Sequence, residues 1–227
     1  MTPQTITQIT FYDRKLKTSE KSSQSLGTAK WQGDVLDIVK QTEHPELYHL
    51  FHNKKSDYPL IQFRNDQGFA ALAGIGNKAS WAVGYFAEAY MKQEPEKSKN
   101  IHQQTAYYTP VQLAEPQTYH IERYLFPRSK RNSYQNLKSV WKDVDDITKR
   151  LKKNIDELVH KQLGFSLPDY TLEIKNISEP KSFRTYKPFG TFFERGIQLR
   201  FSTNILLPPL TAIATGKSKG YGCIKKV

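Results

Sequence analysis

The sequence predicts an α+β protein of two tandem ferredoxin-like units, each an antiparallel sheet with helices packed on one face. In the first half, strand and helix patterns follow one another in the order β-α-β-β-α-β. The second half begins with a long helical pattern and continues mainly as strands. At 227 residues with 37% hydrophobic side chains, the chain can bury one large core or two small ones.

The first unit begins with a strand, a polar loop and a helix. Residues 5–11 alternate between apolar and polar and are rich in β-branched side chains, which predicts a half-buried strand. The Ser-rich residues 15–30 are expected to form a loop. Apolar residues at helical spacing then predict a helix over residues 31–42; they are Trp31, Val35, Leu36 and Val39.

A hairpin, a second helix and two further strands complete this unit. Residues 60–64 and 68–75 are apolar runs joined by a short turn-forming segment, which predicts a hairpin. Ser80 is a candidate N-cap for an apolar helix that ends at the Gln-Glu-Pro of residues 93–95. Residues 97–104 are expected to be a polar connector. The final strands are predicted over residues 107–113 and 117–126.

A basic segment starting at Pro127 is the predicted link between the units, which places the domains at residues 1–127 and 128–227. Its cations are candidate phosphate contacts: Arg128, Lys130 and Arg131. A long helix is predicted over residues 136–162, with Gly164 as its C-terminal stop. Strands follow over residues 169–177 and 196–206, and a last one ends near Ile224. No repeat of fixed period relates the halves, so their pairing depends on element order alone.

Charge and composition limit the partners. The net charge of +12, from 34 Lys and Arg against 22 Asp and Glu, favours a polyanion, with nucleic acid ahead of a membrane surface. No apolar run approaches the roughly 20 residues that span a bilayer, and the N-terminus lacks the order of a signal peptide, so we expect a cytoplasmic protein. Cys223 is the single cysteine, which excludes an intrachain disulfide and a thiolate zinc cluster. No cofactor or metal is predicted.

Residues 44–63, called the histidine stretch below, combine histidines, lysines and a tyrosine with an apolar strand pattern at their end. The polar members are His44, His49, His52, Lys54, Lys55 and Tyr58, and the strand pattern follows over residues 59–63. An imidazole held beside ammonium groups can move a proton near neutral pH while the cations stabilise an anion, which suits phosphodiester chemistry. The residues alone equally allow a polar loop whose histidines only cap and pair.

Residues 214–227 are glycine-rich and basic. Glycines at 216, 220 and 222 can turn backbone N–H groups toward an anion, and Tyr221 offers a ring for stacking on a base. The segment is not a P-loop, because no glycine stands five residues before Gly216, and we therefore do not expect an ATPase. The alternative is a hairpin turn with solubilising lysines. The candidate RNA contacts of this segment are Gly216, Lys217, Ser218, Lys219, Gly220 and Tyr221.

Three stretches carry a resemblance to a known family. The ending Gly-Lys-Ser-Lys-Gly-Tyr-Gly-Cys-Ile (216–224) resembles the C-terminal glycine-rich loop of the RAMP superfamily, whose domains are ferredoxin-like and related to RNA-recognition folds. Leu-Phe-His-Asn (50–53) with Tyr-Pro-Leu-Ile-Gln-Phe (58–63) resembles its CRISPR repeat-cleaving branch, the Cas six type, b subgroup. Residues 69–76 resemble the second hairpin strand of that subgroup. The element order of nearly the whole chain is compatible with two such domains.

The resemblance implies a metal-independent endoribonuclease that cuts CRISPR precursor RNA within its repeats to give guide RNAs. In that family a base activates the ribose 2′-hydroxyl beside the scissile phosphate, leaving a 2′,3′-cyclic phosphate and a 5′-hydroxyl. His52 matches the catalytic histidine of the family, and Tyr58 matches the tyrosine before the Pro-Leu-Ile-Gln strand. The implied partner is the CRISPR repeat transcript, with other effector subunits as candidate partners and no membrane.

One departure from the family pattern concerns the second catalytic group. Relatives often carry another histidine two places after the first, where this chain has Lys54, and an ammonium cannot relay protons near neutral pH unless its pKa falls by several units. His49 is a candidate second imidazole, and Lys54 is a candidate stabiliser of the phosphorane. Two rival functions remain: a non-catalytic RAMP-type RNA-binding subunit of an effector complex, and a DNA-binding protein, which lacks a helix-turn-helix or zinc pattern.

Overall fold

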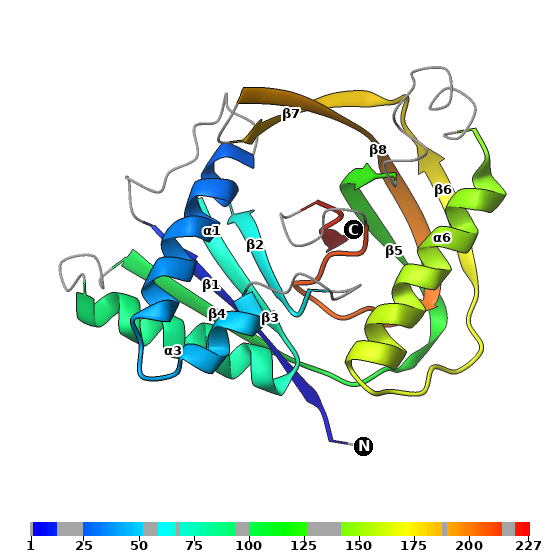
Figure 1. Ribbon diagram of the computed structural model, residues 1–227. Coiled ribbons are helices and arrows are strands. Elements are labelled where there is room, and N and C mark those ends of the chain that lie inside the picture. Colours follow the sequence, from blue (N-terminus) through cyan, green and yellow to red (C-terminus); the bar gives the residue numbers. More distant parts are fainter. Residues whose placement is uncertain are drawn as a thin grey trace.

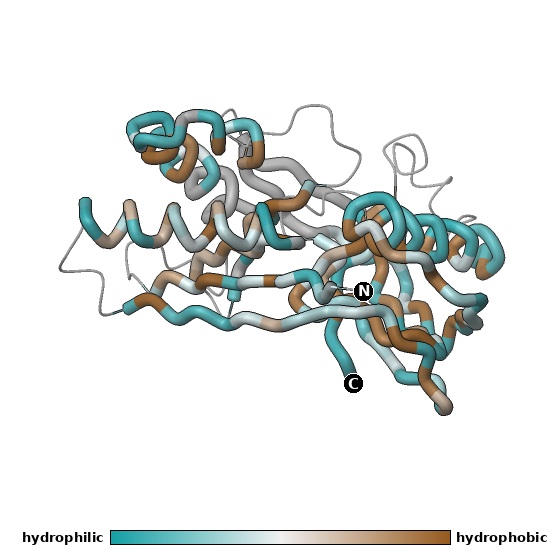
Figure 2. The backbone as a smooth tube through the Cα atoms, turned by 90° about the horizontal axis from the view of Figure 1, so that it is seen from below, coloured by the Kyte–Doolittle hydropathy of each residue, from teal (hydrophilic) through white to brown (hydrophobic). Residues whose placement is uncertain are grey.

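A computed structural model describes residues 2–12, 25–51, 59–66, 69–93, 100–126, 142–187, 190–214 and 221–227, with the backbone alone described at 25–31, 45, 65, 183–187 and 190–194. These residues form two α+β units that lie side by side, each with one antiparallel sheet (Figure 1). In Figure 2 the hydrophobic residues are gathered mainly between the layers, and the outer turns of the helices are mostly hydrophilic. The predicted fold class is therefore confirmed.

The first unit has the element order β-α-β-β-α-β. Its strands lie in the order β2-β3-β1-β4, and every neighbouring pair is antiparallel. This order is the ferredoxin-like one, with the first strand in the interior and the last on one edge. The elements are β1 (Gln4–Phe11), α1 (Ser25–Lys40), β2 (Ile61–Asp66), β3 (Phe69–Ile75), α3 (Asn77–Gln93) and β4 (Ile101–Tyr108), with a short 3₁₀ turn (Pro45–Leu47) and α2 (Tyr48–Phe51) before β2.

The second unit repeats this strand order. Its sheet runs β6-β8-β5-β9, so that β5, β6, β8 and β9 correspond in turn to β1, β2, β3 and β4. A β7–β8 hairpin extends from the sheet, and β7 contacts α1 of the first unit, as Figure 1 shows. The elements are β5 (Gln112–Leu125), α6 (Val144–Asp156) with a π-helical extension (Glu157–Gln162), β6 (Leu172–Ile177), β7 (Lys181–Lys187), β8 (Gly190–Ile205) and β9 (Ile224–Lys226).

The two faces of the first sheet pack against different partners. Ile9, Phe11 and Phe63 belong to the core beneath α1 and α3. Alternation along the strand sends Ile6 to the opposite face, where Ile6 and Tyr108 join the core of the second unit. Each such side chain contributes about 2 kcal/mol when it is fully buried. The shared core therefore fixes the two units relative to each other.

The chain passes from the first sheet to the second at a different position from the predicted domain boundary. β5 pairs with β8 and β9 of the second sheet, whereas β4 is the edge strand of the first, so the change falls between Tyr108 and Gln112 and not at Pro127. The alternation that predicts a strand does not tell which sheet it joins. β4 itself begins at Ile101, inside the predicted polar connector, because an edge strand exposed on both faces carries few apolar residues.

Two helix starts also differ from the prediction. α1 begins at Ser25, inside the predicted loop, since its tertiary position outweighs the weak helix propensity of its first residues. α3 begins at Asn77, and Ser80 lies in its first turn. The Ser80 hydroxyl donates to the carbonyls of Thr5 (2.9 Å) and Gly74 (3.0 Å) in place of capping the helix.

The second half holds further differences. The described part of the long predicted helix begins at Val144, and the carboxylate of Asp143 caps it by accepting from the Asp146 N–H at 2.9 Å. Residues 136–141 of that prediction lie outside the described residues. β7 was not predicted, since its sequence lacks a clear apolar alternation.

Buried tyrosines make the fold sensitive to alkaline pH. Burial raises the pKa of Tyr108, Tyr119, Tyr124 and Tyr170 above the ordinary value of about 10. The folded state holds these protons more tightly than the unfolded chain, so their contribution is complete below about pH 10 and is lost as the pH rises further. We expect the free energy of unfolding, measured by urea titration, to fall above about pH 10.

A matched pair of variants checks the cause. Tyr108→Phe should remove part of the alkaline loss, whereas Tyr107→Phe, at a neighbouring side chain that is 75% exposed, should leave the pH profile unchanged. Equal profiles for the two variants would contradict the assignment to buried tyrosines.

Candidate nucleic-acid interface

The short helix α2 presents His49 to solvent. Leu47 and Phe51, four residues apart, are each 3% exposed, and the ring of Phe51 lies 5.9 Å from that of Phe86 on α3. Residues four apart share one face of a helical segment, so His49, midway between these anchors, lies on the opposite side. The imidazole therefore stands exposed just before the segment that contains His52.

The other predicted catalytic residues lie outside the described residues. His52, Lys54 and Tyr58 fall within residues 52–58, so the structure does not test whether they meet His49. It does describe both ends of that segment. Phe51 is anchored against α3, and Leu60 packs against both cores and accepts a hydrogen bond from the Ile75 N–H at 2.8 Å. Residues 52–58 thus connect Phe51 and Leu60, which are both held in place in the first unit.

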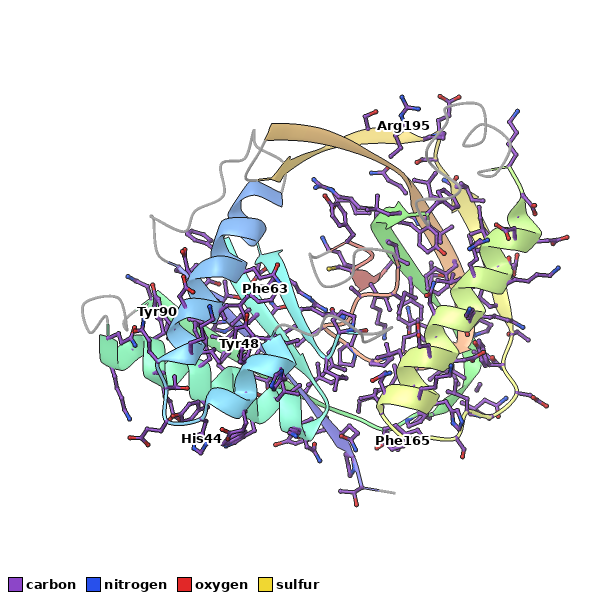
Figure 3. The ribbon with its side chains drawn as sticks, in the orientation of Figure 1. His44, Tyr48, Phe63, Tyr90, Phe165 and Arg195 are labelled. Atoms are coloured by element: carbon purple, nitrogen blue, oxygen red, sulfur yellow. The ribbon has the colours of Figure 1, made fainter. Side chains whose placement is uncertain are left out.

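His44 has a different environment from His49. Its Nδ1 lies 2.8 Å from Oε1 of Glu46, and its ring lies 4.9 Å from that of Tyr85 and 5.7 Å from that of Trp81. Figure 3 labels His44 at the outer side of the first unit. A hydrogen bond to its own backbone and the one to His44 lower the pKa of the Glu46 carboxyl. His44 is therefore engaged in an aromatic cluster on α3, as the polar-loop alternative expects of a histidine.

The described residues fix the base of the glycine-rich segment. Ala212 and Cys223 form an antiparallel bridge, and the Ile213 N–H donates to the Gly222 carbonyl at 2.9 Å. The Gly222 N–H donates to the carbonyl of Arg123 on β5, also at 2.9 Å. Gly222 has φ +77°, and a Cβ there would lie 2.5 Å from that of Ala214, so only glycine fits. The two ends of the segment are held together and fastened to the second sheet.

The predicted RNA contacts of this segment have mixed outcomes. Gly216, Lys217, Ser218, Lys219 and Gly220 lie outside the described residues, as do Arg128, Lys130 and Arg131. Tyr221 is described and is only 3% exposed, which leaves its ring no free face. Base stacking by Tyr221 therefore stays a prediction, and in the structure without RNA the residue beside the Gly222 anchor packs inward.

The sequence prediction missed a polar network on the face of the first sheet that is turned away from α1 and α3. Arg64 donates from one terminal nitrogen to Oε1 of Gln8 at 3.4 Å and from the other to Oε1 of Gln62. Asp66, on the same strand, accepts from the Thr10 hydroxyl at 2.8 Å and from Nε2 of Gln8 at 3.4 Å. The only signal in the sequence is that Gln62 and Arg64 alternate with Ile61 and Phe63.

A groove of about 630 Å³ lies between α3 and β4. Aromatic side chains line it, including Trp81, which is 52% exposed, and Tyr107. Among the described residues that line it, Glu88 is the one with a charge. A groove whose described lining has no Lys or Arg attracts a phosphate backbone poorly, so the basic segments above remain the better candidates for RNA contact.

Neither a metal-binding group nor a membrane-spanning helix is found among the described residues. No three His, Cys, Asp or Glu side chains gather there into a group that could hold a metal ion. Across the same part of the chain, no helix is both long and apolar enough to cross a membrane.

Comparisons with known proteins identify solved structures that have a similar fold. No family model matches the chain, and no curated protein matches its sequence. Among solved structures, the chain is similar to a CRISPR RNA processing endoribonuclease, Cas6b, with a TM-score of 0.62 and 17% identity over 99% of this chain and 100% of that one. It is also similar to Csf5, a type IV Cas6 crRNA endonuclease, with a TM-score of 0.57 and 12% identity over 99% of each chain. A RAMP protein that binds different RNA substrates matches with a TM-score of 0.50 and 13% identity, again over 99% of each chain.

Proposed function

We propose that this chain, which has the fold of the Cas6 and RAMP structures over its whole length, is an endoribonuclease that cleaves CRISPR precursor RNA within its repeats. The whole-chain likeness to the Cas6b structure carries the proposal, since 99% of this chain and 100% of that one are matched. The net charge of +12 and the histidines, lysines and tyrosine of residues 44–63 support it further.

The proposed reaction is a metal-independent transesterification. His52 takes the proton of the 2′-hydroxyl, the 2′-oxygen bonds to phosphorus, and the bond from phosphorus to the 5′-oxygen breaks. A proton donated to that 5′-oxygen completes the 5′-hydroxyl product, and the other product carries a 2′,3′-cyclic phosphate. Tyr58 orients the 2′-oxygen or donates to the phosphate. Positioning, proton transfer and positive charge are all supplied by His, Tyr and Lys side chains.

Two assignments of the second catalytic group follow from the residues present. His49 is exposed on α2 and precedes His52 by three residues, the separation of one helical turn. In one assignment it donates the proton to the leaving oxygen. In the other, Lys54 stabilises the charge of the phosphorane and His49 has no role in the chemistry.

The alternative function is a non-catalytic RAMP-type subunit that only holds guide RNA. The similarity to an RNA-binding RAMP protein is compatible with it, but such a subunit needs no histidine stretch. Incubation with repeat RNA in EDTA separates the two. The endoribonuclease produces a fragment ending in a cyclic phosphate, whereas the subunit binds RNA without cutting it, and cleavage that stops in EDTA would contradict metal independence.

Replacing Lys217 and Lys219 together with alanine should weaken RNA binding without unfolding the protein, because a surface loop contributes little to the core. For every phosphate that the variant no longer binds, the slope of log affinity against log salt should fall by about 0.7. Fluorescence anisotropy at several salt concentrations measures both the affinity and the slope.

The control for this prediction is Lys149→Ala with Lys153→Ala, which removes the same charge from exposed positions of α6. The control should bind repeat RNA more tightly than the loop variant. If the loop variant binds like the wild type, the segment is only a turn with solubilising lysines.

A further inference from the structure

Arg64 projects from β2 toward the face of the first sheet that meets the second unit. Ile61 and Phe63 pack beneath the helices, and Phe63 is labelled on this strand in Figure 3. Alternation therefore places Arg64 on the opposite face, the one from which Ile6 and Tyr108 enter the shared core. The Arg64 side chain is 5% exposed.

Two glutamines orient the guanidinium. Gln62 and Gln8 both turn their amide oxygens toward Arg64. Their amide nitrogens are engaged elsewhere, with the Pro59 carbonyl at 3.5 Å for Gln62 and with Asp66 at 3.4 Å for Gln8. Each glutamine is thus bonded at both ends of its amide, which holds the oxygens in place. The guanidinium is positioned by neutral groups.

The charge of Arg64 is not neutralised locally. Its Nε is buried and has no hydrogen-bond partner among the described residues. Within the same residues no carboxylate forms an ion pair with it, and Asp66 bonds to Gln8 and Thr10 instead. A buried cation is normally paired, because desolvation without a counter-ion is costly. An arginine that only supported the fold would be expected to reach Asp66.

We propose that Arg64 binds a phosphate of the bound RNA. A guanidinium with a free N–H matches a phosphate oxygen in geometry and charge, and the phosphate supplies the missing counter-ion. In the sequence, Arg64 follows Tyr58 by six residues and lies on β2. The assignment rests on the proposed function. Since the side chain is 5% exposed, RNA binding must also turn the guanidinium toward solvent.

Stability in the absence of RNA separates this role from a structural one. Arg64→Met keeps an apolar chain about as long as the aliphatic part of arginine and removes the charge. The substitution removes an unpaired buried charge, but it also leaves the amide oxygens of Gln8 and Gln62 without their donor, so the Tm of the RNA-free protein should change by only a few degrees. A lowered Tm together with wild-type affinity for RNA would assign Arg64 to the support of the fold and overturn the proposal.

Binding to repeat RNA with a 2′-deoxy nucleotide at the cut site gives the second readout. Arg64→Met should lower affinity about tenfold, the usual size of one charged hydrogen bond, and lower the salt slope by about 0.7. Arg64→Lys should restore the slope but only part of the affinity, since an ammonium lacks the planar fork. Arg150→Met is the control, because it removes the same charge from a guanidinium that is ion-paired with Asp146 at 2.7 Å, and its slope should match the wild type.

A scan with single neutral methylphosphonates locates the contact. In one of these RNAs, the methylphosphonate that replaces the contacted phosphate should weaken binding by the wild type. The same RNA should bind Arg64→Met as tightly as the unmodified RNA does. Wild-type protein that does not bind repeat RNA overturns the proposed function itself. Wild-type binding with an unchanged affinity and slope for Arg64→Met, or with no such position in the scan, overturns only the role of Arg64.

Discussion

Replacing His52 with alanine should lower the rate of repeat RNA cleavage by about 10² to 10⁴-fold, the usual contribution of one general acid–base group, while RNA affinity stays nearly the same. The large loss is expected because alanine has no group that can accept the proton of the 2′-hydroxyl. Affinity is expected to persist because many phosphate contacts contribute to it. Single-turnover cleavage with excess protein separates the rate of the chemical step from binding.

Three further variants make the result specific. Tyr58→Phe should lower the cleavage rate less than His52→Ala does, since it removes a hydroxyl and keeps the aromatic ring. His49→Ala decides the second catalytic group: a loss as large as that of His52→Ala makes His49 the second imidazole, and a small one leaves Lys54 as electrostatic support. His44→Ala is the matched control, because that ring is held by Glu46 and Tyr85, and its rate should equal the wild type. Wild-type cleavage by a folded His52→Ala variant would show that another group is the base.

The fold was predictable from the sequence where one face of an element is buried. The alternation in β1 and the hairpin of β2 and β3 appear in the sequence because Ile9, Phe11 and Phe63 must face α1 and α3. β4 could not be predicted over its full length, since an edge strand in contact with water on both faces needs no alternation. The sheet to which β5 belongs is decided by its pairing with β8, a contact between residues far apart in the chain.

The candidate site was predictable only in part. The exposure of His49 follows from its helical spacing between two buried apolar residues. The inward position of Tyr221 does not follow from the sequence, because a tyrosine among glycines and lysines is equally typical of an exposed loop. Arg64 was missed for the opposite reason: a single arginine after an apolar run is normally turned to solvent, and its burial and lack of a counter-ion are visible only in three dimensions.

The second large effect concerns the substrate, since the proposed mechanism uses the RNA itself as the nucleophile. Replacing the 2′-hydroxyl beside the scissile phosphate with hydrogen removes the attacking oxygen and leaves every phosphate in place. The protein should therefore bind this RNA as tightly as the unmodified repeat, because the charge contacts are unchanged. The same substitution at a nucleotide away from the cut should have little effect on cleavage.

The rate at which the protein cleaves repeat RNA that carries a single deoxy nucleotide at the cut site tests the central claim most directly. Attack by the 2′-hydroxyl predicts that no cleavage product of this RNA is detected under conditions in which the unmodified repeat is fully cut. Cleavage of the deoxy RNA at a similar rate would contradict the mechanism and indicate a nuclease in which water is the nucleophile.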